Sequence, residues 1–197
     1  MELHIFRHGE TNWNAEGRAQ SHMGSTLTKL GENQANVLAQ KVKGYAYEKI
    51  YSSSSLRARQ TSEIMWPNRH EEIIYLDDLK EIYLGPWEGQ LYSDIAKTDP
   101  GSLNHFFKEP HLFLLEGAES FKDLTTRAVK IVDEIYRENK GRLVALVGHG
   151  AFIKALLTKI EEKNLSQIWH PPFMQNCAHS IIKFYEKKPP QVTLYAE

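Results

Sequence analysis

Residues 2–11 read ELHIFRHGET and indicate how the chain begins to fold. The apolar stretch 3–6 predicts a buried strand, and Arg7, His8 and Gly9 stand where that strand ends. In α/β sheets, ligands bind beyond the carboxyl ends of the strands. A neutral histidine can attack phosphorus, and an arginine can hold phosphate oxygens in a fixed fork. The segment therefore predicts a ligand-binding loop, against the alternative of an ordinary Arg-His pair on the surface.

Three later segments carry side chains that suit the same chemistry. Residues 143–150 read LVALVGHG and predict a second buried strand that also ends in a histidine. Residues 52–61 place serines and an arginine where a helix begins, and the free amides and dipole of a helix start favour anions. Residues 79–89, LKEIYLGPWEG, place a glutamate in a loop punctuated by glycine and proline. Together these segments offer the positive donors and the proton donor that a phosphoryl site built on histidine needs.

The order of six motifs along the chain resembles that of the histidine phosphatase superfamily, which includes phosphoglycerate mutases and many small phosphatases. The motifs are RHGETNWN (7–14), GRAQ (17–20), LTKLGENQA (27–35), YSSSSLRARQT (51–61), LKEIYLGPWEG (79–89) and VGHG (147–150). Two further stretches, HFFKEPHLF (105–113) and IWHPPFM (168–174), resemble the small broad-specificity phosphatase branch most. The resemblance covers nearly the whole chain and implies the phosphoglycerate mutase-like fold.

Strand and helix patterns alternate along the chain, which predicts an α/β fold: a three-layer α/β/α sandwich with a mostly parallel central sheet. The expected strands are 2–6, 49–51, 73–76, 143–147, 179–185 and 191–195, and the expected helices are 31–43, 57–65, 120–139 and 151–159. No repeat, low-complexity tract or long linker divides residues 1–197, so we expect one domain. Residues 91–117 are less regular, and the superfamily places a substrate lid in that region.

Composition narrows the class of protein. A chain of 197 residues can bury a full core, and 41% hydrophobic with 25% charged residues is ordinary for a soluble globular protein. The net charge of −1 supplies no basic field that would recruit nucleic acid or an anionic membrane, and no apolar run approaches the length of a bilayer span. A single cysteine excludes an intramolecular disulfide, and the first strand starts too early for a secretory signal to precede it. We therefore expect a cytoplasmic protein.

The resemblance and the residue chemistry assign the same reaction. His8 would attack phosphorus and become phosphohistidine, so one ring nitrogen must be unprotonated while the other donates, we expect, to a backbone carbonyl near Gly9. Glu81 matches the superfamily's general acid and would protonate the leaving oxygen. Glu88 and Asp78 are competing candidates for the acid, and Glu10 is a weaker one.

Several further side chains are expected at the site. Arg7, Arg57 and His149 would surround the phosphoryl oxygens, where charge spreads in the transition state. Substrate-binding candidates are Asn14, Gln20, His22, Gly150, Phe107 and Trp169, the two aromatic residues being about equally compatible with a plain core role. The other histidines lack HxxxH or HxH spacing among themselves, so neither a metal nor another cofactor is expected.

The leading interpretation is a metal-independent phosphomonoester phosphatase that acts on small organic phosphates. Only residues 82–148 separate Glu81 from His149, whereas the mutases that share this core usually carry a longer insertion that shields phosphohistidine from water. A cofactor-dependent phosphoglycerate mutase is the alternative. A non-catalytic phospho-ligand-binding module is disfavoured because all five catalytic residues are present. The edge of the C-terminal hairpin could pair with a second copy, which would give a homodimer.

Overall fold

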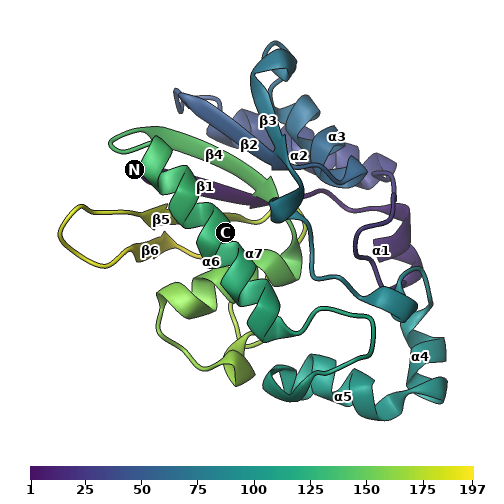
Figure 1. Ribbon diagram of the computed structural model, residues 1–197. Coiled ribbons are helices and arrows are strands. Elements are labelled where there is room, and N and C mark those ends of the chain that lie inside the picture. Colours follow the sequence, from purple (N-terminus) through teal and green to yellow (C-terminus); the bar gives the residue numbers. More distant parts are fainter.

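The computed structural model describes residues 1–197 and contains one mixed sheet with the strand order β3-β2-β4-β1-β5-β6 (Figure 1). The strands are β1 (Glu2–Arg7), β2 (Lys49–Ser53), β3 (Ile73–Leu76), β4 (Leu143–Gly148), β5 (His179–Lys183) and β6 (Gln191–Leu194). Strands β1 to β4 pair in parallel, whereas β5 runs antiparallel to β1 and β6 antiparallel to β5. The predicted, mostly parallel sheet is confirmed.

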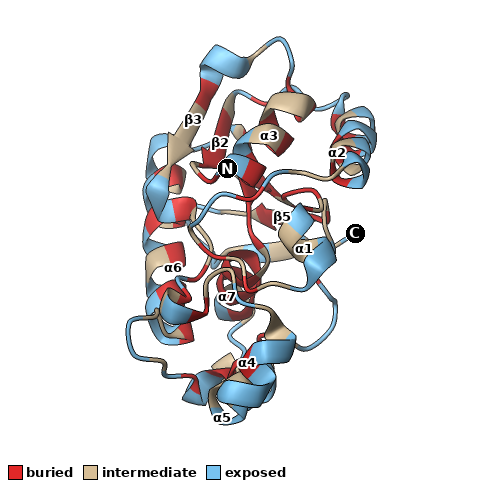
Figure 2. Cartoon of the chain, turned by 90° about the vertical axis from the view of Figure 1, so that its right-hand side faces the viewer, coloured by how far each residue is buried: buried red, intermediate tan, exposed pale blue.

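Helices cover both faces of this sheet. They are α1 (Asn12–Glu16), α2 (Lys29–Val42), α3 (Leu56–Met65), α4 (Tyr92–Thr98), α5 (Pro100–Lys108), α6 (Phe121–Glu138) and α7 (Gly150–Ile160), with short 3-10 turns at His70–Glu72, Asp77–Leu79, Gly85–Trp87, Pro110–Leu112 and Leu165–Gln167. Helices α6 and α7 lie on one face, and α2 and α3 lie on the other (Figures 1 and 2). This arrangement is the predicted three-layer α/β/α sandwich.

The pleat of the central strands divides the core in two. On β1, Leu3 and Ile5 belong to the larger apolar cluster beneath α6 and α7. Phe6 points the opposite way and packs with Leu38 of α2 and Ala58 of α3. Successive side chains of a strand alternate between the faces, so a strand covered on both sides must be apolar at nearly every position. This is why the central strands are continuous apolar runs in the sequence, and Figure 2 shows their buried residues between the helical layers.

Residues 91–117 are more regular than expected, because they form α4 and α5 at one end of the molecule (Figure 1). The side chain of Asp99 caps α5 by accepting a hydrogen bond from the amide of Ser102, and Pro100 occupies the first turn. The two helices have 7 and 9 residues, which is too short for a clear helical period in the sequence. Helix α1 escaped prediction for the same reason, with 5 residues.

The other predicted elements are present with boundaries shifted by a few residues. Helix α2 starts at Lys29 because the side chain of Thr28 accepts a hydrogen bond from the amide of Gly31. Strand β5 ends at Lys183 rather than at residue 185.

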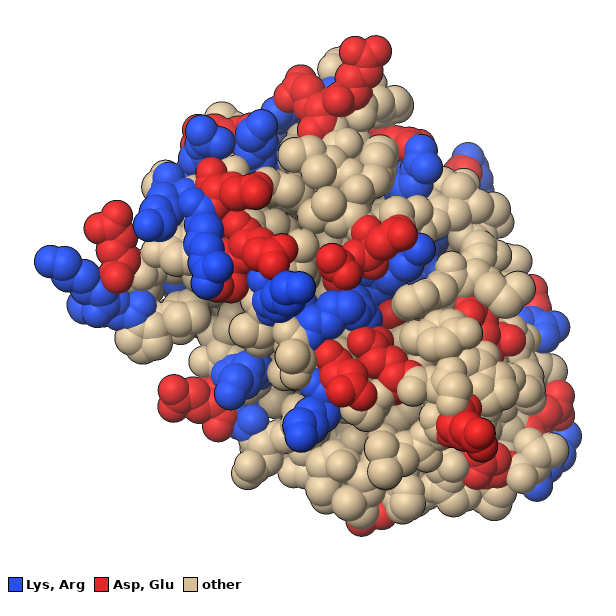
Figure 3. All heavy atoms as spheres, viewed as in Figure 1, with Lys and Arg blue, Asp and Glu red and all other residues tan.

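Every helix is too short or too polar to be a membrane-spanning segment. Basic and acidic side chains are interspersed on the face seen in Figure 3.

The sheet brings the two histidine-bearing loops together. Strands β1 and β4 are parallel neighbours, and their register pairs Arg7 with Gly148. His8 and His149, each one residue further along, therefore leave the same edge of the sheet side by side. Strand β2 lies on the other side of β4 and ends at Ser53. Three neighbouring strand ends thus deliver the polar groups of the candidate site.

Candidate active site

His8 is buried, and its two ring nitrogens have different partners. Nδ1 lies 2.7 Å from the carbonyl oxygen of Gly9, which is the backbone acceptor predicted for this ring. Nε2 lies 3.3 Å from Nε of Arg57, which can only donate. The pair of contacts places the imidazole proton on Nδ1 and leaves Nε2 unprotonated, with its lone pair facing Arg57.

The pKa of His8 is lowered well below its usual value, first by burial and then by the positive charges of Arg57 and Arg7. The pKa of His149 is lowered in the same way, by burial first and then by Arg57. Both shifts disfavour the imidazolium form. His8 is therefore a neutral imidazole at physiological pH, which is the form that a nucleophile requires.

We expect the rings of His8 and His149 to stay neutral in the free protein as the pH falls from about 7.5 to about 5.5, a range that includes the pKa of about 6.5 of a free histidine. Ring ¹⁵N chemical shifts would measure this, with His8→Asn and His149→Asn for assignment. The unfolded chain takes up these protons while the folded chain does not, so stability should fall, and Tm with it, as the pH drops below about 6.5. A titration midpoint near 6.5 for His8 would contradict this expectation.

Gly9 is required by a close approach rather than by its own backbone angles. A Cβ atom at this position would lie 2.5 Å from the carbonyl oxygen of Gly31 in α2. The amide of Gly9 donates to the hydroxyl of Thr61, whose own hydroxyl donates to the carbonyl of Arg57. The loop that carries His8 and Gly9 is thus held against α2 and α3.

Arg57 comes from the first turn of α3 and is 1% exposed. Its Nη2 donates to the carbonyl of Ser21 at 2.7 Å, which orients the guanidinium across His8. Burial lowers the pKa of Arg57 to about 10, so the side chain keeps its charge at neutral pH. Arg7 is held by a different segment, because its Nη1 donates to the carbonyl of Met174 at 2.6 Å.

Two buried nitrogens at the site have no hydrogen-bond partner within the protein: Nε of Arg7 and Nδ1 of His149. The other nitrogen of His149, Nε2, lies 2.8 Å from the hydroxyl oxygen of Ser53. A Ser53 hydroxyl turned toward Nε2, rather than toward the hydroxyl oxygen of Ser55 at 3.2 Å, would place the imidazole proton on Nδ1. Buried polar atoms without partners are rare and costly, so they mark groups that serve a ligand. The two nitrogens suit the oxygens of a bound phosphate.

Glu81 faces this cluster from the acid loop, by which we mean residues 78–83. Its Oε1 accepts from the amides of Ile82 and Phe152, and its Oε2 accepts from the amide of Ala151, each at 2.9 Å. The last two amides belong to the first turn of α7, where a helix dipole attracts negative charge. A Cβ atom on Gly150 would lie 3.4 Å from Nε of Arg7 and 3.7 Å from Oε2 of Glu81, so this glycine stands between the two side chains.

A cavity of about 400 Å³ is lined by Arg7, His8, Arg57 and Glu81. His149 is not among its lining residues, and its ring centroid lies 5.2 Å from that of His8. Glu81 is its one acidic lining residue, so the competing carboxylates Glu88, Asp78 and Glu10 lie outside it. Its polar lining residues include Arg7, His8 and Arg57, and its aromatic lining residues, here called the aromatic wall, are Tyr92, Phe106, Phe107, Trp169 and Phe173. Polar and aromatic groups in one cavity suit a phosphomonoester with an organic group.

Most of the predicted substrate-binding residues line this cavity, namely Asn14, Gln20, Gly150, Phe107 and Trp169. His22 does not. Its Nε2 lies 2.9 Å from the carbonyl oxygen of Glu81, on the backbone of the acid loop. No group of three His, Cys, Asp or Glu side chains is arranged to hold a metal ion.

Sequence reasoning missed several side chains of the cavity, including Lys154 and Gln175. Lys154 extends from α7, and its ammonium donates to the carbonyls of His170 (2.6 Å) and Pro172 (3.0 Å). It thereby holds the segment that carries Trp169. The available signal was a single charge inside the otherwise apolar first turns of α7, which is rarely tolerated without a partner.

Comparisons with known proteins agree with this geometry. The sequence profile of the histidine phosphatase superfamily (branch 1) matches residues 3–197. A metal-independent phosphoserine phosphatase from Arabidopsis thaliana is 32% identical over 164 residues, which cover 82% of this chain and 69% of the plant protein.

Solved structures match the whole chain. The structure of Bacillus stearothermophilus YhfR superposes with a TM-score of 0.95 at 34% identity, covering 100% of this chain and 96% of that one. A phosphoserine phosphatase mutant from Entamoeba histolytica, in complex with phosphoserine, superposes with a TM-score of 0.86 at 25% identity and the same coverage of both chains. The profile and the solved structures thus agree over nearly the full length, and the plant relative agrees over 82% of it.

Proposed function

Because the chain belongs to the histidine phosphatase superfamily (branch 1) and is a phosphatase-type hydrolase, we propose that it is a metal-independent phosphomonoesterase that acts through a phosphohistidine at His8. One arrangement supports this most. The unprotonated Nε2 of His8 accepts a hydrogen bond from Nε of Arg57, in a cluster with two buried nitrogens that have no protein partner. A nucleophile surrounded by donors for three oxygens is what phosphoryl transfer requires.

In the first step, Nε2 of His8 attacks phosphorus and forms the N–P bond while the ester P–O bond breaks. Arg7, Arg57 and the Nδ1–H of His149 donate to the phosphoryl oxygens, whose charge they stabilise in the transition state. Glu81, carrying a proton, delivers it to the leaving oxygen, so the alcohol departs neutral. The amide of Gly150, the first residue of α7 and part of the cavity lining, would offer a further donor.

In the second step, water attacks the phosphohistidine and passes a proton to the Glu81 carboxylate. The N–P bond breaks, inorganic phosphate leaves, and His8 returns to its neutral form. Glu81 thus acts as acid and then as base at one position, as microscopic reversibility requires. The buried positive and donor groups supply what a metal ion would otherwise provide.

The substrates we propose are small phosphomonoesters with an organic group that fits the aromatic wall. Phosphoserine is the first candidate, because proteins similar to this chain are named as phosphoserine phosphatases. We also propose that the α4–α5 segment serves as the substrate lid, since Phe106 and Phe107 of α5 line the cavity. The indole of Trp169 donates to the carbonyl of Phe106, which joins the lid to the facing segment.

The test is phosphate release in excess EDTA from para-nitrophenyl phosphate, phosphoserine and 3-phosphoglycerate. We expect sustained release from at least one ester, at a rate that added Mg²⁺ does not restore or raise. Loss of activity on EDTA treatment, recovered with metal, would contradict the proposal.

A phosphoglycerate mutase is distinguished by a second assay. It would release little phosphate and would interconvert 3- and 2-phosphoglycerate in the presence of 2,3-bisphosphoglycerate. A non-catalytic binding module would bind phosphoserine with no turnover of any ester.

A further inference from the structure

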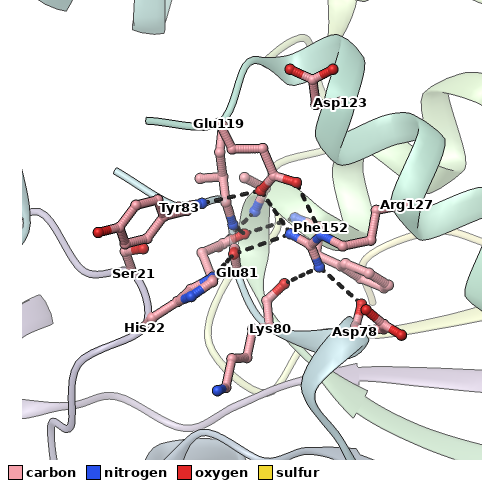
Figure 4. Close-up of polar contacts among 12 residues, drawn as sticks. Ser21, His22, Asp78, Lys80, Glu81, Tyr83, Glu119, Asp123, Arg127 and Phe152 are labelled. Atoms are coloured by element: carbon pink, nitrogen blue, oxygen red, sulfur yellow. Dashed lines mark hydrogen bonds and ion pairs between the residues drawn. The ribbon is translucent and has the colours of Figure 1, made fainter. Parts of the chain in front are cut away.

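Arg127 of α6 reaches the backbone of the acid loop (Figure 4). Its Nη1 donates to the carbonyls of Asp78 at 2.8 Å and Lys80 at 2.9 Å. Its Nη2 lies 3.3 Å from the carbonyl of Glu81. One guanidinium therefore binds three carbonyls within four consecutive residues, and the last of them belongs to the general acid.

Glu119 orients this guanidinium. It accepts from Nε and Nη2 of Arg127 at 2.9 Å and 2.7 Å, a bidentate contact in which both side chains are largely buried. It also binds the far end of the acid loop. Its carboxylate accepts from the amide of Tyr83 at 3.1 Å, and its own amide donates to the Tyr83 carbonyl at 2.7 Å. The Arg127–Glu119 pair thus holds the loop on both sides of Glu81.

The acid loop depends on such contacts, because residues 81–84 belong to no helix or strand. The side chain of Glu81 is fixed at its carboxyl end by the α7 amides, but its backbone is held by Arg127 and by His22, whose Nε2 lies 2.9 Å from the same carbonyl. The Arg127 guanidinium also lies over the ring of Phe152, 5.9 Å from its centroid. The amide of Phe152 is one of those that bind the Glu81 carboxylate.

We propose that Arg127, oriented by Glu119, is a positioning residue for Glu81: it fixes the backbone of the acid loop so that the carboxyl group meets the leaving oxygen. The inference rests on the proposed function, since it takes Glu81 as the general acid. A general acid must stand within about 2.6–3.2 Å of the atom it protonates. A misplacement of about 1 Å can cost about 10²-fold in rate.

Two esters separate this role from a general structural one. The leaving group of para-nitrophenyl phosphate is a weakly basic phenolate, which needs little help from an acid. The leaving group of phosphoserine would be a strongly basic alkoxide if no acid protonated it. kcat/KM covers the steps up to P–O cleavage and so excludes hydrolysis of phosphohistidine. The ratio of the two kcat/KM values is unaffected by a change in the fraction of folded protein.

We expect Arg127→Met to lower kcat/KM for phosphoserine at least about tenfold more than for para-nitrophenyl phosphate, a fraction of the 10²–10⁴-fold that general acids contribute. For Arg127→Lys, the ratio of the two kcat/KM values should lie between those of Arg127→Met and the wild type, because an ammonium cannot bind three carbonyls and a carboxylate at once. Glu119→Gln, which keeps the shape of the side chain, should shift the ratio in the same direction. Arg137→Met is the matched control, since Arg137 lies on α6 and pairs only with Asp133 at the surface.

The double variant decides between the two roles. In a Glu81→Gln background, Arg127→Met should change the ratio less than about twofold, because residues that act through one another are non-additive. If Arg127→Met lowered kcat/KM equally for both esters, this inference would be overturned and the role of Glu81 left intact. The same holds if Arg127→Met changed the ratio as much in the Glu81→Gln background as in the wild type. If Glu81→Gln lowered kcat/KM equally for both esters, the assignment of the acid would be overturned and this inference with it.

Discussion

Replacing His8 with alanine should lower phosphate release by at least about 10⁴-fold, because the covalent route through phosphohistidine is lost. The remaining groups, Arg7, Arg57 and His149, would still bind phosphate but could only assist direct attack by water. Phosphate release from para-nitrophenyl phosphate and phosphoserine in excess EDTA measures the effect.

The intermediate itself can be followed in the same variant. With ³²P-labelled substrate and a rapid denaturant quench, label should remain on the wild-type protein and be absent from His8→Ala. His70→Ala removes an exposed histidine outside the cavity and should behave as the wild type. Inorganic phosphate should still raise the Tm of His8→Ala, which would show an intact site. Label on the His8→Ala protein would disprove His8 as the phosphoryl acceptor.

The second large effect is expected for Glu81→Gln, which removes the proton that the leaving oxygen needs. We expect kcat/KM for phosphoserine to fall by about 10²–10⁴-fold, with a much smaller decrease for para-nitrophenyl phosphate. Steady-state kinetics with both esters measures this. The kcat for para-nitrophenyl phosphate should also fall, because Glu81 activates the water that attacks phosphohistidine.

Glu88→Gln is the matched control for the acid. Glu88 lies in the same motif but outside the cavity, where its carboxylate accepts a hydrogen bond from the amide of Met23. It should keep the wild-type ratio of the two kcat/KM values. A selective loss in Glu88→Gln, with Glu81→Gln unaffected, would move the role of the acid to Glu88.

The proposed nucleophile and the residues beside it could be predicted because they lie in short, local patterns. His8 and His149 each follow an apolar strand, and parallel strands deliver their carboxyl ends to one edge. Arg57 stands at the start of a helix, and Glu81 is identified by its motif. The helices within residues 91–117 were harder to predict, since α4 and α5 are too short to show a period.

Contacts between distant segments had no signal in the sequence. Arg7 is held by the carbonyl of Met174, which lies 167 residues further along the chain. Arg127 binds carbonyls 46 to 49 residues before it. Backbone carbonyls are present at every residue, so no residue type marks which of them will be an acceptor.

The sequence by itself determined the α/β class, the central strands and the residues of the candidate site, because continuous apolar runs and side-chain chemistry are properties of the residues. Only the tertiary structure decided which nitrogen of His8 is unprotonated, which buried nitrogens lack partners, and how the acid loop is held. These features depend on distances between atoms of separate segments, and those distances exist only once the sheet and its two helical layers have packed.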